Sequence, residues 1–257
     1  MRGLMSLCLS LACSHAMAQA PQRCVDIDHV PFVIEKGGCY RMTRDLVTNM
    51  QSGDAVLVRA DDVLIDLCGH GIENRTGGST RARGIAGTNR KAVTIRNGWI
   101  QGFRYGVSLS DSRGRSEGHV VEDLRVLGSR ACGIYLSGVR STVTRCQVDH
   151  TGGRGPIAVG IAQAGSDSRI TQNRVTWTLA DPNDGYAVGL ELAPGFGRVV
   201  SANRVHAVRG GRVSQGIRCG IAFTADNDVD AVAVPYSSCA AADRPHPFPF
   251  PYPPPPL

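Results

Sequence analysis

Short stretches in which apolar and polar residues alternate recur along this chain, and many of them contain a glycine followed by a branched aliphatic residue. Examples are "YGVSLS", "CGIYLS", "VGIAQA" and "VGLELA". The spacings between the anchoring glycines are 22, 27, 27, 29 and 31 residues. A repeat of this length is typical of a solenoid, in which each repeat forms one turn. The anchors are Gly84, Gly106, Gly133, Gly160, Gly189 and Gly220, and the aliphatic residues expected to point inward after the last five are Val107, Ile134, Ile161, Leu190 and Ile221.

A second apolar pattern interleaves with the glycine motif. Its members stand in pairs five residues apart, and the residues around them are Gly, Asn, Ser and Asp, which turn a chain sharply. Each repeat therefore carries two or three short strand signals. The pairs are Ile95 with Ile100, Val121 with Val126, Val143 with Val148, Ile170 with Val175 and Val200 with Val205.

Three classes of solenoid have repeats of about this length. The Leu-x-x-Leu-x-Leu-x-x-Asn signature of leucine-rich repeats is absent, and so is the strict six-residue period of left-handed hexapeptide helices. Irregular turns of two or three strands, with loops of variable length, suit a right-handed parallel β-helix. We therefore predict an all-β chain that folds as a right-handed parallel β-helix (solenoid) of about six coils.

Three segments carry a resemblance to a known superfamily: "GCYRMTRDL", "SGDAVLVRADDVLIDLCGHGI" and "AVTIRNGWIQGFRYGVSLS". The chain resembles secreted bacterial right-handed β-helix proteins of the pectate-lyase-like (pectin lyase-like) superfamily, which are built from PbH1 repeats. The resemblance covers residues 38 to about 224. It implies the fold, whereas function is left open, because the superfamily includes lyases, hydrolases, epimerases and non-catalytic adhesins. The chain departs from the usual pattern at Cys68, where such proteins often carry Asn.

The two ends of the chain differ from the repeats. Arg2, the apolar run 4–12 and the small residues Ala16 and Ala18 have the order of a signal peptide, so we expect export to the periplasm or the outside. A lipoprotein cut before Cys13 is a poorer match. No later stretch approaches the roughly 18 apolar residues of a membrane helix. The expected organisation is a signal peptide (1–18), an N-terminal cap (19–55), the parallel β-helix (56–224), a C-terminal cap (225–242) and a disordered Pro-rich tail (243–257).

Seven cysteines remain after the signal peptide, so at least one thiol stays free. Alignment of the repeats places Cys68 with Cys146, and Cys132 with Cys219, each pair three rungs apart. At roughly 4.8 Å per rung these separations exceed the reach of a disulfide. The plausible bridges are Cys24–Cys39 and Cys219–Cys239, and Cys68, Cys132 and Cys146 are then expected to be small buried hydrophobic residues.

The formal net charge is +6, and Lys36 and Lys91 are the only lysines. Arginine presents a planar fork that suits carboxylates, sulfates or phosphates, which favours an acidic polysaccharide as the partner. A GC-rich coding bias with a solvated surface explains the charge equally well. Nucleic acid is disfavoured because the chain is exported and has no aromatic-basic stripe. We expect a monomer.

The repeat alignment also predicts two ladders. Asp66, Arg96 and Glu122 fall in one outward column with alternating sign, which we interpret as a surface ion-pair ladder rather than a catalytic line. Asn173 and Asn203 fall on adjacent rungs of a turn column, where a ladder of stacked amides is expected.

Three long loops follow the last apolar column in consecutive repeats: "DHTGGRGP" (149–156), "WTLADPNDGY" (177–186) and "HAVRGGRVSQ" (206–215). Neighbouring loops of a solenoid often form its binding face. Acids, imidazoles, guanidiniums and an indole converge here, although the run from Asp181 to Gly185 is also a typical turn sequence. The candidate catalytic residues are His150, His206, Asp149 and Asp181, and the candidate substrate-binding residues are Trp177, Arg209, Arg212 and Asp184.

Two functions fit these residues. A polysaccharide lyase or epimerase would neutralise a uronate carboxylate with Arg209 and Arg212, or with a calcium ion held by Asp181 and Asp184, while a histidine removes the C5 proton. No other cofactor is expected, and a zinc site is not predicted. A glycoside hydrolase would need two carboxylates, such as Asp149 and Asp181, and ranks lower. The alternative is a non-catalytic envelope or adhesion protein that binds glycan on the same face; if the loops diverge, the Tyr135 and Glu191 face is the next candidate.

Overall fold

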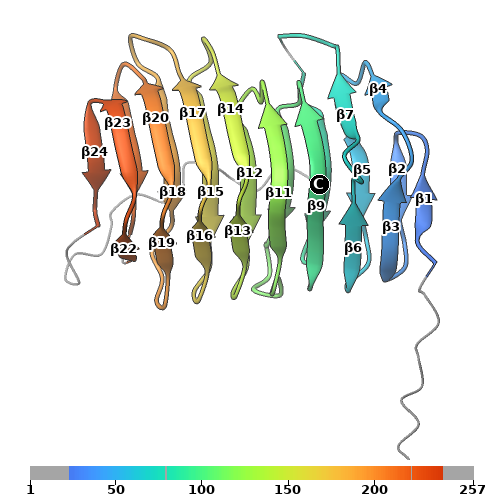
Figure 1. Ribbon diagram of the computed structural model, residues 1–257. Helices are drawn as coiled ribbons and strands as arrows, with labels where there is room; N and C mark the ends of the chain where they lie inside the picture. Colours follow the sequence, from blue (N-terminus) through green and yellow to red (C-terminus); the bar gives the residue numbers. More distant parts are fainter. Residues whose placement is uncertain (1–22, 79, 221, 240–257) are drawn as a thin grey trace, which may run out of the picture.

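The computed structural model describes residues 23–78, 80–220 and 222–239, and in these residues the chain is a parallel β-solenoid without helices (Figure 1). Successive turns stack along one axis, and each turn adds rungs to two parallel sheets. The predicted all-β parallel β-helix is therefore confirmed. The solenoid is somewhat longer than the expected six coils because strands between Val25 and Val58 also form rungs. The expected signal peptide and Pro-rich tail lie outside the described residues, as do residues 19–22 of the N-terminal cap and 240–242 of the C-terminal cap.

The first sheet has fifteen strands arranged as two adjoining columns, which the longer strands β9 and β11 join. One column runs β1-β3-β6-β9-β11-β13-β16-β19-β22, and the other contains β4, β7, β14, β17, β20 and β23. The strands are β1 (Val25–Ile27), β3 (Gly38–Met42), β4 (Leu46–Thr48), β6 (Val63–Asp66), β7 (Gly71–Asn74), β9 (Val93–Gln101), β11 (Val120–Leu127), β13 (Thr142–Thr144), β14 (Gln147–Gly152), β16 (Arg169–Thr171), β17 (Arg174–Leu179), β19 (Val199–Ser201), β20 (Arg204–Arg209), β22 (Phe223–Ala225) and β23 (Asp228–Val232).

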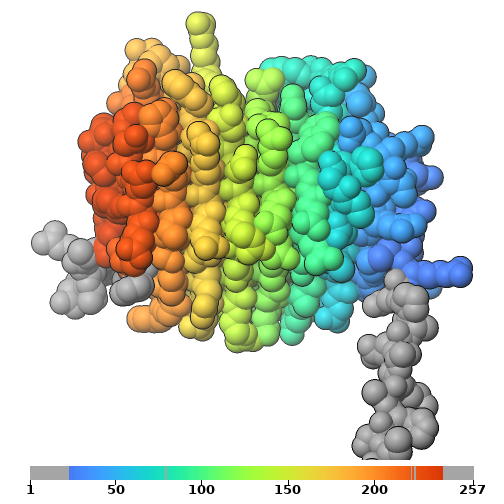
Figure 2. All heavy atoms as spheres, in the orientation of Figure 1, coloured from blue at the N-terminus to red at the C-terminus, as the bar shows by residue number. Residues whose placement is uncertain are grey.

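The second sheet has nine strands in simple succession, so that each turn contributes one strand. In the space-filling view the turns appear as successive coloured bands along the rod (Figure 2). The strands are β2 (Phe32–Ile34), β5 (Asp54–Val58), β8 (Arg83–Thr88), β10 (Tyr105–Ser110), β12 (Cys132–Ser137), β15 (Ile157–Ala164), β18 (Tyr186–Leu192), β21 (Val213–Arg218) and β24 (Val234–Ser237).

The apolar residues that the sequence pattern paired form continuous columns inside the solenoid. Val121 pairs with Ile95 on one side and Val143 on the other, and Val148 pairs with Val126 and Val175. All six side chains are buried at 1% exposure or less. Because the strands are parallel and in register, each side chain stacks on its counterpart one turn away, and one core runs along the rod.

The recurrent glycines are required by close packing at the start of the second-sheet strands. A Cβ atom at Gly133 would lie 2.3 Å from Val148 Cγ1 and 2.6 Å from the carbonyl oxygen of Gly160. Gly106 and Gly160 show the same two close approaches to the next glycine and to a valine of the first sheet. Each repeat therefore has glycine at this position, because there is no room for any side chain.

One anchor of the predicted repeat is wrong. Leu190 pairs with Ile217, so the glycine that follows Gly189 in the stack is Gly216 and not Gly220. The sequence offers two Gly-Ile pairs four residues apart in "QGIRCGI", and the first of them continues the 27-residue spacing. Gly220 has a φ of +52° and lies in a turn after β21. Ile221 lies outside the described residues.

The stacked amides are confirmed and extend further than predicted. Asn173 donates from its backbone N and its Nδ2 to Asn203 Oδ1 at 2.9 and 3.0 Å, and Asn203 donates in the same way to Asn227 Oδ1. The Nδ2 of Asn173 also reaches the carbonyl oxygen of Val143. The ladder satisfies buried polar groups where the two columns of the first sheet meet.

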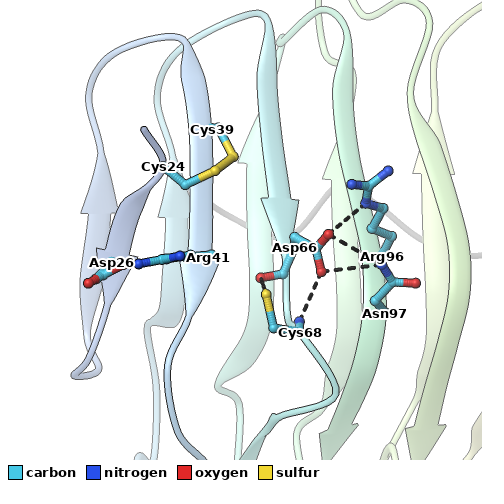
Figure 3. Close-up of a disulfide and its surroundings, with 8 residues drawn as sticks. All are labelled: Cys24, Asp26, Cys39, Arg41, Asp66, Cys68, Arg96 and Asn97. Carbon is cyan, nitrogen blue, oxygen red and sulfur yellow. Dashed lines mark hydrogen bonds and ion pairs between the residues drawn. A yellow bond between two sulfur atoms is a disulfide. The ribbon is translucent and has the colours of Figure 1, made fainter. Parts of the chain in front are cut away.

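The cysteine pairing is as predicted, whereas the burial of one free cysteine, Cys68, is not. The disulfides are Cys24–Cys39 and Cys219–Cys239. Cys132 and Cys146 are buried, but Cys68 is exposed, which corrects the expectation. Cys68 lies beside Asp66, whose Oδ1 accepts a hydrogen bond from the backbone N of Cys68 (Figure 3). The turn after β6 is two residues longer than its neighbour, so Leu67 fills the inward position and Cys68, with a φ of +51°, stands outside.

The aligned columns correct a second cysteine placement. Cys132 pairs with Val159 and lies outside the main core, and it does not share a column with Cys219, which belongs to that core. The predicted outward column of Asp66, Arg96 and Glu122 is in register. Arg96 binds Asp66 at 2.8 Å (Figure 3), whereas Glu122 pairs with Arg145 of the next turn at 2.8 Å and not with Arg96.

Candidate functional site

Five of the candidate residues lie on strands of the second column of the first sheet: Asp149 and His150 on β14, Trp177 on β17, and His206 and Arg209 on β20. His150 and Trp177 occupy the same position on adjacent rungs, and both have left-handed backbones with φ of +53° and +54°. Each left-handed residue interrupts the alternation of the strand, so that two successive side chains face outward. In the sequence this appears as two residues, instead of one, between inward positions, as in "VDHT" and "VTWT".

Three aromatic rings form a row across successive turns. The imidazole of His150 stacks on the indole of Trp177 with centroids 6.2 Å apart and planes at 20°. The imidazole of His206 meets the other side of the row edge-on, with its centroid also 6.2 Å from the Trp177 ring. Trp177 is 41% exposed. The three residues, predicted from separate loops, are therefore brought together into one row.

Carboxylates orient both imidazoles of the row. Asp149 Oδ2 lies 3.0 Å from His150 Nδ1, and its Oδ1 accepts a hydrogen bond from Thr176 Oγ1 at 2.6 Å. Asp230 Oδ1 lies 2.5 Å from His206 Nδ1. Each histidine thus has its Nδ1 engaged and its Nε2 directed elsewhere, which is the arrangement of a positioned base. Asp230 was not identified from the sequence.

A groove of about 380 Å³ adjoins the row on its N-terminal side. His150 and Trp177 form one wall, and Gln101 and Arg130 come from the neighbouring turns. Arg75, which follows β7, closes the far side and carries an ion pair to Glu73 at 2.8 Å. The groove therefore crosses several turns of the solenoid and combines two aromatic rings with two guanidinium groups.

Arg75 and Arg130 were missed by reasoning from the sequence. They stand in loops that contain no acid, histidine or aromatic run, and only the stacking of the turns shows that they face His150 and Trp177. The available signal was their place directly after the last apolar column, which is the same place that singled out the three longer loops.

The remaining predicted residues lie beyond the row, in loops that stack as expected. The backbone N of Asp181 donates to Gly155 O at 2.8 Å, and Gly211 N donates to Asp181 O at 2.9 Å. Arg209 ends β20, and Arg212 lies 3.9 Å from Asp184. Asp184, Arg209 and Arg212 are exposed and Asp181 is half-buried, and none of the four lines the groove that His150 and Trp177 border.

The side chain of Asp181 stabilises the turn of its own loop. Its Oδ1 accepts hydrogen bonds from the backbone N of Asn183 and of Asp184, and these bonds hold the pKa of Asp181 below its ordinary value. Asp184 is 85% exposed. In the part of the chain that the structure describes, no group of three or more His, Cys, Asp or Glu side chains is arranged to hold a metal ion. Calcium at Asp181 and Asp184 stays a prediction.

The second candidate face, which carries Tyr135 and Glu191, lies on the second sheet. Glu191 is 2% exposed, and burial raises the pKa of its carboxyl. Tyr186 donates a hydrogen bond to Glu191 Oε1, and Arg218 Nη1 lies 3.2 Å from the same oxygen. A polymer cannot reach these side chains, because Tyr135 and Glu191 are both buried.

No protein-family model matches the sequence, and no curated protein matches it. Among solved structures, the chain is similar to the Dettilon tailspike protein, with 11% sequence identity and a TM-score of 0.39. The match covers 82% of this chain and 50% of the tailspike chain, so this chain spans half the length of that protein. Within the described residues no helix has the length and apolarity needed to cross a membrane. The fold is established by the strand pairing, and membership of the pectate-lyase-like superfamily stays a prediction.

Proposed function

We propose that the protein binds an acidic polysaccharide along the row of His150, Trp177 and His206 and in the adjoining groove. The observation that carries the proposal is the indole of Trp177, which is 41% exposed and is held outward by a left-handed backbone. That conformation costs a non-glycine residue roughly 1–2 kcal/mol. Residues held in sparsely populated backbone regions cluster at functional sites, where the strain serves to place a side chain.

The chemistry of the row suits sugars. A pyranose ring has an apolar face of C–H groups that stacks on an aromatic ring, while its hydroxyls need hydrogen-bonding groups at the side. Trp177 provides the ring, and Gln101 beside it provides an amide. Because the groove crosses the turns, a linear polymer can extend along the axis of the rod.

The charge of the groove favours an acidic glycan. Arg75 and Arg130 are exposed, and a guanidinium binds carboxylate or sulfate with two parallel hydrogen bonds. The two disulfides support an exported, oxidising location, which is where such polymers occur. Export itself, to the periplasm or the outside, is part of the proposal.

Retention on immobilised alginate, polygalacturonate and heparin tests the binding. The parent protein is expected to be retained on at least one of these matrices and released by salt, and Trp177→Ala is expected to elute with the void volume. Phe196→Ala removes a more exposed aromatic ring, 76% exposed, from a different loop and is expected to behave as the parent. Equal retention of the parent and Trp177→Ala would show that the row is not the site.

Two charge-matched double variants locate the ionic contacts. Arg75→Ala with Arg130→Ala is expected to flatten the salt dependence of binding, because fewer ionic contacts remain to be screened. Arg209→Ala with Arg212→Ala removes the same charge from the loops beyond the row and is expected to change the salt dependence less. The reverse order would place the ligand on those loops instead of in the groove.

A second candidate function is a polysaccharide lyase or epimerase, which the two His–Asp pairs favour. A lyase would use the Nε2 of His150 or His206 to take the C5 proton of a uronate, with formation of the C4–C5 double bond and departure of the oxygen on C4. Incubation with alginate, pectate and glycosaminoglycans, with and without calcium, tests this by absorbance of the unsaturated uronate. Binding without any such absorbance, and without change of the polymer, would leave the non-catalytic envelope or adhesion protein.

A further inference from the structure

The outer face of the second sheet is apolar and yet buried. Tyr105, Cys132, Val159 and Val188 pair rung by rung across β10, β12, β15 and β18. Together with Tyr135 they belong to a cluster separate from the main core. Tyr135 stands between Ile134 and Leu136, which both point into the core, so its own side chain points outward.

The exposure of this face differs from that of the first sheet. Tyr105 and Tyr135 are each 5% exposed, and Cys132, Val159 and Val188 are 0% exposed. The outward residues of the first sheet, such as Arg125, Gln147, Arg174 and Arg204, are exposed in the same turns. Because these outward side chains are excluded from solvent in a single chain, another part of the same chain must cover them.

No described strand supplies this cover. The strands of the second sheet make their extensive contacts with one another and with strands of the first sheet, which lie across the core. The outer side of β10, β12, β15 and β18 therefore needs a segment that is not a strand of either sheet.

We propose that the proline-rich segment 243–257, "DRPHPFPFPYPPPPL", covers this face. The segment contains eight prolines together with Phe248, Phe250 and Tyr252. Proline donates no ladder hydrogen bond, so the segment cannot add a strand, whereas proline-rich segments bind grooves lined by aromatic rings. Tyr105, Tyr135 and Tyr186 provide such rings on the face.

The segment starts in the right place and is long enough. The chain leaves β24, the last strand of the same sheet, and the Cys219–Cys239 disulfide fixes it there. The eighteen residues from Cys239 to the end span about 56 Å in a polyproline conformation, at roughly 3.1 Å per residue. Tyr105 on β10 lies five rungs from β24, or about 24 Å at roughly 4.8 Å per rung.

This inference is independent of the proposed glycan site, which lies on the first sheet. It assigns the tail a function as an intramolecular cover of the second sheet, including the buried group of Glu191, Tyr186 and Arg218.

Three free thiols in the described part of the chain test the cover, because they lie at different distances from the surface. Cys68 is exposed, Cys132 lies on the covered face and Cys146 lies in the inner core. Native protein with its disulfides intact is treated with iodoacetamide, and each site is quantified by mass spectrometry. Of these three, Cys68 alone is expected to react quickly in the full chain. After truncation behind Ala242, Cys132 is expected to react at least about tenfold faster, while Cys146 stays protected because the solenoid remains folded.

A full-length variant and a peptide complete the test. Substitution of Phe248, Phe250 and Tyr252 by serine keeps the prolines and the chain length, and it is expected to expose Cys132 partly. A synthetic peptide of residues 243–257 added to the truncated protein is expected to restore protection. Unchanged protection of Cys132 without the tail would overturn the proposal, and so would rapid reaction in the full chain or protection that rises with protein concentration, which would indicate a second copy.

Discussion

The imidazole of His150 stacks on the indole of Trp177 one turn away, with the two ring planes at 20°. Both residues have left-handed backbones, which is an uncommon conformation for residues other than glycine. The stack is thus built from two strained positions in register, and the parallel repeat is what brings them together. The row extends along the rod because successive turns have a left-handed residue at equivalent positions.

The strain at Trp177 predicts an unusual order of stability. Trp177→Gly relieves roughly 1–2 kcal/mol of left-handed strain, and Trp177→Ala does not, while both lose the stacking with His150. The glycine variant is therefore expected to exceed the alanine variant in free energy of unfolding by about 1 kcal/mol. Neither variant should bind glycan. Urea unfolding checks the order, and a less stable glycine variant would show that position 177 is not left-handed in solution.

At Gly133 we expect the replacement of glycine to lower the free energy of unfolding for a steric reason. Gly133→Ala would place a Cβ atom 2.6 Å from a backbone oxygen of Gly160, so the strands must move apart. Overpacking of this kind typically costs about 1–3 kcal/mol. Gly155→Ala is the control, because the nearest atom to its Cβ would be 4.0 Å away and its backbone is not left-handed. Equal loss of stability in the two variants would contradict the packing argument.

The strand columns could be predicted from the sequence because they depend on a local pattern. Period-two alternation and a repeated spacing placed Val121 beside Val143 and Val148 beside Val175, and the register confirms both. The pattern is ambiguous where a motif occurs twice within one turn, as with Gly216 and Gly220, or where a turn changes length, as at Cys68. In those places only the spatial register decides which residue points inward.

The groove could be predicted only in part. His150, Trp177 and His206 carry side chains whose chemistry is visible in the sequence. Arg75 and Arg130 take part through their place in the stack, since they are far from Trp177 in sequence and reach the same groove through successive turns. Arginine is also frequent throughout the chain, so neither residue stood out by type.

Replacement of Asn203 is expected to lower the free energy of unfolding strongly. Its Oδ1 accepts from Asn173 N and its Nδ2 donates to Ile170 O at 2.8 Å, and the residue is 1% exposed. Asn203→Ala leaves buried groups without partners, which costs about 1–3 kcal/mol each. Gln172→Ala, at an exposed position of the preceding turn, should stay within about 0.5 kcal/mol of the parent. Thermal or urea unfolding of both variants compares them directly.

His119 predicts a loss of stability in mild acid. The side chain is 0% exposed, and burial lowers its pKa from 6.5 to about 4, against the opposing pull of Asp111 and Asp61. The unfolded chain takes up a proton as the pH falls through 6.5, whereas the folded chain does so only near 4. The stability present above pH 6.5 is therefore lost between these values, by at most about 3 kcal/mol.

Unfolding free energies at several pH values check this effect. His119→Asn keeps a hydrogen-bond acceptor near Val93 N and does not titrate, so it should flatten the profile between pH 6.5 and 4. A profile that is unchanged by His119→Asn would contradict a neutral, buried imidazole at this position.

The fluorescence of Trp177 tests the central claim most directly. The chain has two tryptophans, so Trp99→Phe leaves Trp177 as the sole indole reporter. Titration with oligosaccharides of the retained acidic glycan is expected to change the emission of Trp177 saturably, with an apparent affinity that falls as salt is added. A neutral glucan should leave the emission unchanged. Calorimetric binding of the acidic glycan without any change in Trp177 emission would show that the polymer binds elsewhere and would contradict the account.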